Sequence, residues 1–254
     1  MMGCSHLVLG AAGYLAVESC APGLGLHQAA PAELAAGALV ASGAAMMADL
    51  DHPSATVSRT LGPVTHALSR VVHVVVGGHR KGTHTIWAWL GMTALTSWAL
   101  GLSSSPWIVL GVSIFAAALF LRVLTEADGI ICLLLAAVLG GAVTLAAGHD
   151  HAWLLVAVSS GYALHLVGDV ITVEGIPPLY PLGPQVRVPI IGAVGHWRER
   201  CAGAACGLVA FYLLVTMVFL PGWQEQQRQQ LMDRPSSGVA QVVVMTGTRE
   251  SARR

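Results

Sequence analysis

Residues 129–147 read GIICLLLAAVLGGAVTLAA, an apolar run that contains no charged side chain. As an α-helix this run would reach about 28 Å, which matches the ~30 Å hydrocarbon core of a bilayer. The run has no polar face that water could solvate. It therefore predicts a helix that crosses a membrane.

The rest of the chain has the same apolar character. Charged residues make up 10% of the 254 residues, hydrophobic residues 55%, and the mean hydropathy is +0.68. A soluble domain with this composition could not keep its surface hydrated, so the bilayer is the natural solvent. Comparable apolar runs lie at residues 6–21, 33–48, 84–102, 106–124, 152–172 and 202–221. We therefore predict an all-α fold, a polytopic membrane helical bundle of about seven spans, and the pattern is compatible with six to eight.

Two stretches between the spans do not fit a membrane crossing. Residues 63–77 hold a short apolar run beside Arg70 and His73, which predicts a short interfacial helix. Residues 174–200 hold five prolines and no long apolar run, which indicates an ordered loop.

The C-terminal end has a different composition. After Trp223 the chain is rich in Gln, Ser and Arg, a mixture that cannot bury a core. We expect residues 1–222 to form one membrane-embedded domain and residues 223–254 to form a polar, disordered tail.

Charge and cysteine content exclude several function classes. The chain has 13 basic and 13 acidic side chains, so we expect no nucleic-acid partner. Its five cysteines are odd in number and form no CxxC pair, so neither a disulfide framework nor a thiolate zinc site is indicated. The bilayer is the one partner that the composition predicts.

Basic residues are distributed unevenly between the two ends of the predicted spans. If the seven spans alternate, one face receives the N-terminus and residues 49–83, 122–128 and 173–201. That face carries Arg59, Arg70, Arg80, Lys81, Arg122, Arg187, Arg198 and Arg200. The short loops of the other face, residues 22–32, 103–105 and 148–151, contain neither Lys nor Arg. By the positive-inside rule the first face is cytoplasmic, and the protein is expected in the inner (plasma) membrane.

The same alternation gathers the side chains that could bind a metal ion. Eight histidines and aspartates at or near the ends of the predicted spans fall on the basic face: His6, Asp49, Asp51, His52, His79, His84, His165 and Asp169. The distribution of Lys and Arg between the two faces did not require the histidines and aspartates to fall on the basic face. The convergence favours a metal site on the cytoplasmic side.

His165 and Asp169 are four residues apart on a predicted helix, so their side chains lie on one side, about one turn from each other. An aspartate deep in a membrane helix costs about 2.5–3.5 kcal/mol on insertion scales, and such a group faces the bundle interior with a partner. A cation is one such partner.

Two further motifs carry candidate ligands. Asp49-Leu-Asp-His-Pro-Ser ends a helix of small residues with three potential ligands, and Pro53 stops the helix from continuing. In His79-Arg-Lys-Gly-Thr-His84 two imidazoles flank two cations and a glycine. A metal ion with Arg80 and Lys81 beside it would suit an anionic group such as phosphate.

Each motif alone has an ordinary explanation. A His–Asp pair on a helix is often a structural hydrogen bond, an Asp-x-Asp before proline is often a solvated cap, and basic residues beside a span set topology. We expect five other histidines to be solvated or hydrogen-bonded: His27, His66, His73, His149 and His151. The eight residues together favour a divalent ion, and His/Asp ligation without cysteine fits Zn or Mn. Eight candidates exceed what one tetrahedral ion needs, so two ions are compatible with the set.

At these motifs the sequence resembles the YdjM-type family of inner-membrane proteins, described as metal-dependent hydrolases and as LexA-binding. The resemblance covers about residues 1–220 and rests on His6, the motifs at 49–54 and 79–85, the stretch from His165 to Leu182, and Gly-His-Trp-Arg-Glu at 195–199. The family tends to have Gly-Ser where this chain has Gly195-His196, so His196 is either an added ligand or a local substitution. Lys81 stands where the family commonly has a small residue. The family is distantly similar to zinc phospholipase C and related nucleases, which implies phosphoester substrates.

These observations predict a membrane-bound metal-dependent hydrolase in which a metal-activated water attacks an ester or phosphoester. A lipid-linked substrate is favoured because the site lies at the membrane surface. Asp51 is the candidate second-sphere orienter, bridging ligand or general base, and Arg80 and Lys81 are the candidates for stabilising negative charge.

Two alternatives stay open at this point. The first is a membrane scaffold or regulatory protein with a structural metal site, which the sequence does not exclude. The second is an ion transporter. Transport would require ionisable residues at mid-membrane and on both faces, whereas the predicted spans contain few ionisable residues between their ends.

Overall fold

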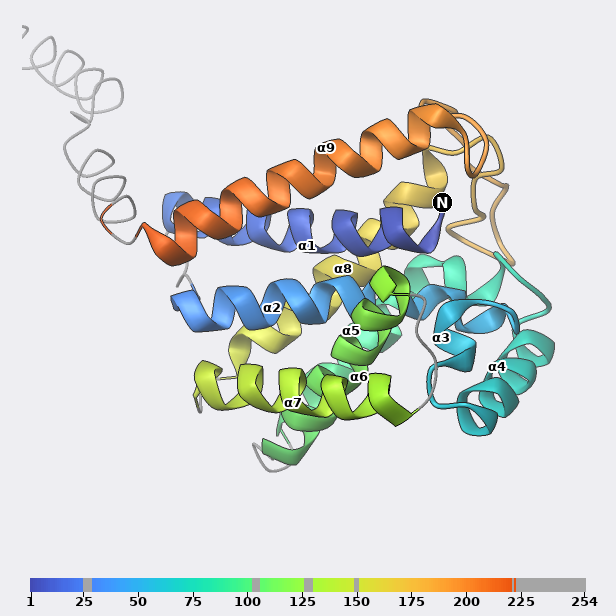
Figure 1. Cartoon of the computed structure of the whole chain (residues 1–254). Helices are drawn as coiled ribbons and strands as arrows, with labels where there is room; N and C mark the ends of the chain where they lie inside the picture. Colours follow the sequence, from blue (N-terminus) through green and yellow to red (C-terminus); the bar gives the residue numbers. More distant parts are fainter. Residues whose placement is uncertain (25–28, 102–105, 126–129, 149–150, 221, 223–254) are drawn as a thin grey trace, which may run out of the picture.

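The computed structural model describes residues 1–24, 29–101, 106–125, 130–148, 151–220 and 222 (Figure 1). Within these residues the α-helices are α1 (Gly3–Cys20), α2 (Pro31–Ala44), α3 (Thr56–Arg59), α4 (Pro63–Val75), α5 (Ile86–Gly101), α6 (Pro106–Thr125), α7 (Ile130–Ala147), α8 (Ala152–Val170) and α9 (Trp197–Leu214). Short 3-10 turns form η1 (Ala21–Leu24), η2 (Met47–Asp51) and η3 (Gly82–His84), and a π-helical turn forms η4 (Val215–Phe219). The all-α prediction is confirmed. The predicted tail, residues 223–254, lies outside the described residues.

Six helical segments are long and apolar enough to cross a membrane: Gly3–Leu24, Pro31–Asp51, Pro106–Thr125, Ile130–Ala147, Ala152–Val170 and Trp197–Phe219. The remaining predicted span is present as α5, which has 16 residues. At 1.5 Å per residue α5 reaches about 24 Å, less than the ~30 Å of the hydrocarbon core. The prediction of about seven membrane helices agrees with this arrangement.

Small residues let α1, α2 and α8 pack closely. A Cβ atom added at Gly10 of α1 would lie 2.5 Å from the Ala41 carbonyl oxygen, and one added at Gly161 of α8 would lie 2.3 Å from the same oxygen. Both helices therefore approach the backbone of α2 at one residue, which only glycine permits. This crossing holds together the three helices that carry, or are followed by, candidate ligands.

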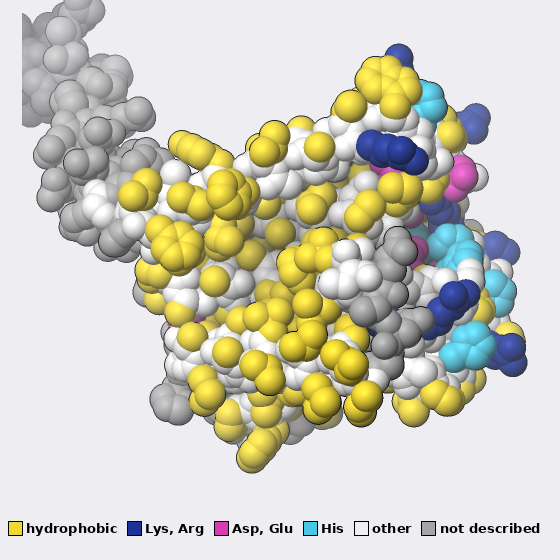
Figure 2. Space-filling model, in the orientation of Figure 1, with side chains coloured by type: hydrophobic (Ala, Val, Ile, Leu, Met, Phe, Trp, Pro, Cys, Tyr) yellow, Lys and Arg dark blue, Asp and Glu magenta, His cyan; other side chains and the backbone are white. Residues whose placement is uncertain are grey.

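The polar side chains gather at one end of the bundle. Figure 2 shows basic and histidine side chains at the right-hand end, whereas apolar side chains cover most of the visible surface elsewhere. In Figure 1 the N-terminus, α3 and α4 lie at that same end. The bundle therefore presents one polar end and a largely apolar flank.

The predicted interfacial helix is present as α4. Its buried side chains are polar: Ser69 accepts a hydrogen bond from Ser58 at 2.9 Å, and Thr65 accepts one from the Leu61 amide at 3.1 Å. His73 of α4 lies 2.7 Å from the Asp51 carbonyl oxygen, which joins the helix to η2. Helix α4 thus supports the turn that carries Asp49 and Asp51.

Residues 171–196 form the ordered loop that the prolines indicated. Two isolated backbone bridges, Thr172 with Gly192 and Ile176 with Val186, hold it together. The Ile86 amide donates to the Pro178 carbonyl at 2.9 Å, so the loop is attached to the start of α5.

Candidate metal centre

Three overlapping groups of His and Asp side chains have ligand atoms within 4.8 Å of one another. They are Asp49, Asp51, His79 and His84; His6, Asp49 and His165; and His84, His165 and Asp169. Seven of the eight predicted residues belong to these groups, and they come from α1, η2, the 76–84 segment and α8. Segments far apart in the sequence therefore meet at one place.

His84 and His165 form the centre of the cluster, with their Nε2 atoms 3.2 Å apart. Asp49 Oδ1 lies 3.6 Å from His84 Nε2 and 3.7 Å from His165 Nε2. Asp169 Oδ2 lies 3.5 Å and 3.6 Å from the same two atoms. Two ligand triangles therefore share the edge between the two imidazoles.

These separations have the size that a tetrahedral ion requires. With metal–ligand bonds of about 2.0–2.2 Å, two ligands of a tetrahedral ion are about 3.4 Å apart. The five separations that make up the two triangles run from 3.2 to 3.7 Å, close to that value, so each triangle has the size of one face of such an ion's coordination shell. The donor set of imidazole nitrogens and carboxylate oxygens therefore fits a divalent ion such as zinc or manganese.

Each central imidazole is oriented through its other nitrogen. His165 Nδ1 lies 2.5 Å from the Ala45 carbonyl oxygen, which can only accept, so Nδ1 carries the hydrogen and Nε2 is free to bind. His84 Nδ1 lies 3.0 Å from Thr83 Oγ1 and 3.4 Å from Asp51 Oδ2. Both rings thus direct Nε2 toward the two triangles.

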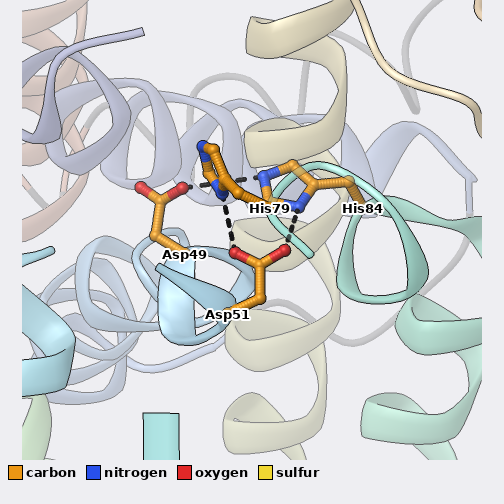
Figure 3. Close-up of side chains that lie close together, drawn as sticks. All are labelled: Asp49, Asp51, His79 and His84. Atoms are coloured by element: carbon orange, nitrogen blue, oxygen red, sulfur yellow. Dashed lines mark hydrogen bonds and ion pairs between the residues drawn. The ribbon is translucent and has the colours of Figure 1, made fainter. Parts of the chain in front are cut away.

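Asp51 is fully buried and receives hydrogen bonds on both oxygens (Figure 3). His79 Nδ1 lies 2.8 Å from Oδ1, and the Thr83 hydroxyl and the Arg80 amide donate to Oδ2 at 2.6 and 3.0 Å. These are hydrogen-bond distances, shorter than the edge of a metal coordination sphere. The geometry matches that of a residue that orients its neighbours.

The backbone of the 76–84 segment turns sharply to reach Asp51. Arg80 has a φ of 58°, in the left-handed region that few residues other than glycine adopt. This turn points the Arg80 amide at Asp51. The Arg80 side chain extends toward the end of α8, where Nη2 lies 3.5 Å from Asp169 Oδ1, and toward the following loop, where Nη1 lies 2.7 Å from Glu174.

Asp169 has cationic and imidazole neighbours on both oxygens. The Met1 amino group lies 2.6 Å and His6 Nε2 3.3 Å from Oδ1, and the His6 ring stacks on His165 with 3.8 Å between ring centres. Asp169 is 1% exposed. The Met1 amino group and Arg80 supply positive charge to this buried carboxylate, which therefore has the charged partner that the sequence argument requires.

The electrostatics of His84 show the same need for a cation. Burial acts to lower the pKa of His84, but its interactions with Asp169, Asp49 and Asp51 act in the opposite direction and together raise the pKa to about 10. Three buried or half-buried carboxylates surround this ring. A proton or a metal ion bound among them would offset their negative charge.

Two predicted residues lie beside the cluster rather than in it. His52 belongs to none of the three groups: its Nδ1 contacts Ser54 Oγ at 2.8 Å and its ring lies edge-on to His79. Lys81 is exposed, and among the described residues its side chain forms no hydrogen bond or ion pair with the cluster. His196, the other residue in question, caps α9 by accepting from the Arg198 amide and is not in any of the groups.

A comparison with protein-family models places the chain in a known family. The model described as YdjM inner membrane protein matches residues 1–223. The chain belongs to this family. Neither a curated protein nor a solved structure gave a match. Together with the six apolar helices, membership of the YdjM family shows a multi-pass inner-membrane protein.

Several residues that support the centre of this YdjM-family protein were not predicted. The Ala45 carbonyl, Thr83 and His73 form hydrogen bonds whose partners in the cluster the sequence motifs do not specify. Glu199 is fully buried and accepts from the Met2 and Gly195 amides, which holds the start of α1 near α9. An acidic residue in the first turn of an apolar helix was the signal that could have identified Glu199.

Proposed function

We propose that this protein is a membrane-bound metal-dependent hydrolase that acts on an ester or phosphoester, with its metal centre at the cytoplasmic face. The observation that carries the proposal is the pair of ligand triangles around His84 and His165, whose edges match those of a tetrahedral zinc or manganese site. A divalent ion bound there would supply Lewis acidity and lower the pKa of a bound water toward neutrality.

The four central residues have distinct surroundings. His84, His165 and Asp169 are buried, whereas the Asp49 side chain is 18% exposed. His79, which is 31% exposed, lies on the same open side. Substrate would therefore approach past Asp49 and His79, while the other ligands stay shielded from solvent.

Asp51 and His79 are suited to handle protons at the opening. Asp51 holds His79 through a 2.8 Å hydrogen bond, so the imidazole is oriented by a buried carboxylate. This is the arrangement of a general base held by a carboxylate. Asp51 and His79, together with Asp49 and His84, also have the donor atoms to bind a second ion. The measured ratio of metal to protein would distinguish binding of a second ion from a role in proton transfer.

Arg80 is placed to stabilise negative charge. Its guanidinium lies beside Asp169, and among the described residues the buried Arg80 Nε has no hydrogen-bond partner. A donor left free next to ligand carboxylates could bind the oxygen of a phosphate or of a developing oxyanion.

The test is metal analysis and a substrate panel on the protein purified in detergent. Bis(p-nitrophenyl) phosphate, p-nitrophenyl esters and a phospholipid would be offered to the wild type, to His165→Ala and to His66→Ala, whose histidine lies on α4 outside the three groups. We expect one or two divalent ions in the wild type and in His66→Ala, and loss of metal and turnover in His165→Ala. A wild type free of metal would refute the site. A metal-loaded protein that turns over nothing on the panel would favour the scaffold alternative.

A further inference from the structure

A cavity lies beside the candidate metal centre, next to the 76–84 segment that carries His79 and His84. It has a volume of about 500 Å³, within the range of ligand pockets. Its walls come from the end of α4, the turn before α5, the first turns of α5 and the proline-rich loop. The lining residues the argument uses are Val75, Gly77, Gly82, Thr85, Trp87 and Tyr180.

Helix α4, which forms one wall, has the opposite polarity to a helix at a surface in water. Helix α4 buries Thr65 and Ser69 and exposes an apolar stripe at positions i, i+4, i+7 and i+11. The stripe consists of Val64, Leu68, Val71 and Val75. A helix with polar residues inside and valines outside is stable where lipid replaces water, as on an interfacial membrane helix.

The cavity opens onto this apolar stripe. Val75, 77% exposed, is the last residue of α4 and lines the cavity. Trp87, 53% exposed, lines the opposite wall at the start of α5, and Trp is enriched at the membrane–water boundary. Apolar lipid tails therefore have a continuous path from the bilayer along α4 into the cavity.

The rim of the cavity carries a cation. A Cβ atom at Gly77 would lie 3.7 Å from Lys81 Cδ and 3.5 Å from the Tyr180 hydroxyl, so both side chains pass close to Gly77, which lines the cavity. Lys81 is exposed and makes no ion pair among the described residues. An ammonium and a hydroxyl above an apolar cavity match the phosphate and tails of a membrane lipid.

We propose that this cavity binds a bilayer phospholipid, with its acyl region between Val75 and Trp87 and its phosphate at Lys81. The site adjoins the metal centre, because Gly82 and Thr85 of its wall flank the turn that presents Thr83 and His84 to the cluster. The binding site does not depend on the proposed hydrolase activity. It gives a role to Lys81, whose Cδ lies close to Gly77 of the cavity wall.

The test compares two lipids that share their acyl chains, of which only one carries a phosphate-containing head group. Native mass spectrometry in detergent would measure the binding of dioleoyl-phosphatidylglycerol and of dioleoylglycerol to the whole chain. We expect Lys81→Ala to weaken binding of the phosphatidylglycerol about fivefold, the effect of one basic residue near a lipid surface, and to leave dioleoylglycerol unchanged. Lys81→Arg should keep the preference, and Arg70→Ala on α4 is the matched control for loss of a basic charge.

A second pair of variants tests the apolar wall. Val75→Asp places a carboxylate in the cavity and should lose both lipids, whereas Val64→Asp makes the same change at the other end of the exposed stripe and should retain them. Wild-type binding by both Lys81→Ala and Val75→Asp would overturn the proposal. Equal losses from Lys81→Ala and Arg70→Ala would also overturn it, because they would show diffuse attraction by surface charge. All variants are exposed at the substituted position, so folding is not the expected cause of any loss.

Discussion

Replacing Asp51 by Asn tests whether this residue orients the metal ligands or binds metal itself. The carboxylate accepts hydrogen bonds from His79, Thr83 and the Arg80 amide, and Oδ2 lies 3.4 Å from His84 Nδ1. Asparagine keeps the shape but offers a single acceptor oxygen, and its NH2 group would face donors. The His84 ring would lose the partner that directs Nε2 toward the cluster, while all four central ligand atoms remain.

The expected magnitude follows from that role. Loss of a partner that orients a metal ligand costs about 10–100-fold in metal affinity, or about 1.4–2.8 kcal/mol. Competition with a chromophoric chelator in detergent would measure the dissociation constant of zinc for the wild type and Asp51→Asn. Glu174→Gln is the control, because it makes the same carboxylate-to-amide change at a 56% exposed partner of Arg80.

Two outcomes would refute the reasoning. Complete loss of metal in Asp51→Asn, equal to the loss in His165→Ala, would show that Asp51 is a ligand. A dissociation constant within about twofold of the wild type, matching Glu174→Gln, would show that the hydrogen bonds to His84 do not orient the ring.

Three further predictions address pH, packing and sidedness. Because the pKa of His84 is raised to about 10, the ring carries a proton at neutral pH in the metal-free protein, and a bound ion must displace that proton. Zinc affinity, measured by competition with a chelator, should therefore rise about tenfold per pH unit between pH 6.5 and 8.5. An affinity that does not change with pH would contradict this prediction. Gly161→Ala should destabilise the bundle by about 1–3 kcal/mol, since its Cβ would lie 2.3 Å from the Ala41 oxygen, whereas Gly91→Ala, which meets nothing within 4 Å, should leave the midpoint of thermal unfolding in detergent nearly unchanged. A reporter fused after Gly195, ahead of α9, should behave as cytoplasmic, and a periplasmic signal would refute the proposed orientation.

The helical architecture could be predicted because it depends on run length and composition alone. Any apolar run near 20 residues predicts a span, and the short α5 shows where that rule loses precision: a helix can be apolar and still fall short of the full hydrocarbon thickness. The convergence of the ligands could also be predicted, because alternation of spans assigns each loop to one of two faces. The proximity of His165 and Asp169 could be predicted from the helical repeat alone, because residues four apart lie on one side of a helix.

The division of labour within the cluster could not be predicted, because it depends on fractions of an ångström and on backbone turns. Asp49 and Asp51 are two residues apart and chemically identical. Asp49 Oδ1 lies 3.6 and 3.7 Å from two imidazole nitrogens, the separation expected between two ligands of one ion, whereas Asp51 lies at hydrogen-bond distance from three donors. Arg80 and Lys81 are adjacent, yet the Arg80 side chain, on a left-handed turn, reaches Asp169, whereas the Lys81 side chain lies close to Gly77.

The packing of the bundle and the metal centre are coupled through α2. The Ala41 carbonyl marks the point at which Gly10 and Gly161 bring α1 and α8 against α2, and one turn later the Ala45 carbonyl orients His165. An ion bound at either triangle would join η3 to α8, one of the three helices that meet at that crossing. Binding to the folded state alone stabilises it by about 2.7 kcal/mol at a free ion concentration 100 times the dissociation constant. A substitution that loosens the crossing should therefore weaken metal binding without touching a ligand, because the positions of the ligand atoms depend on how closely the three helices approach.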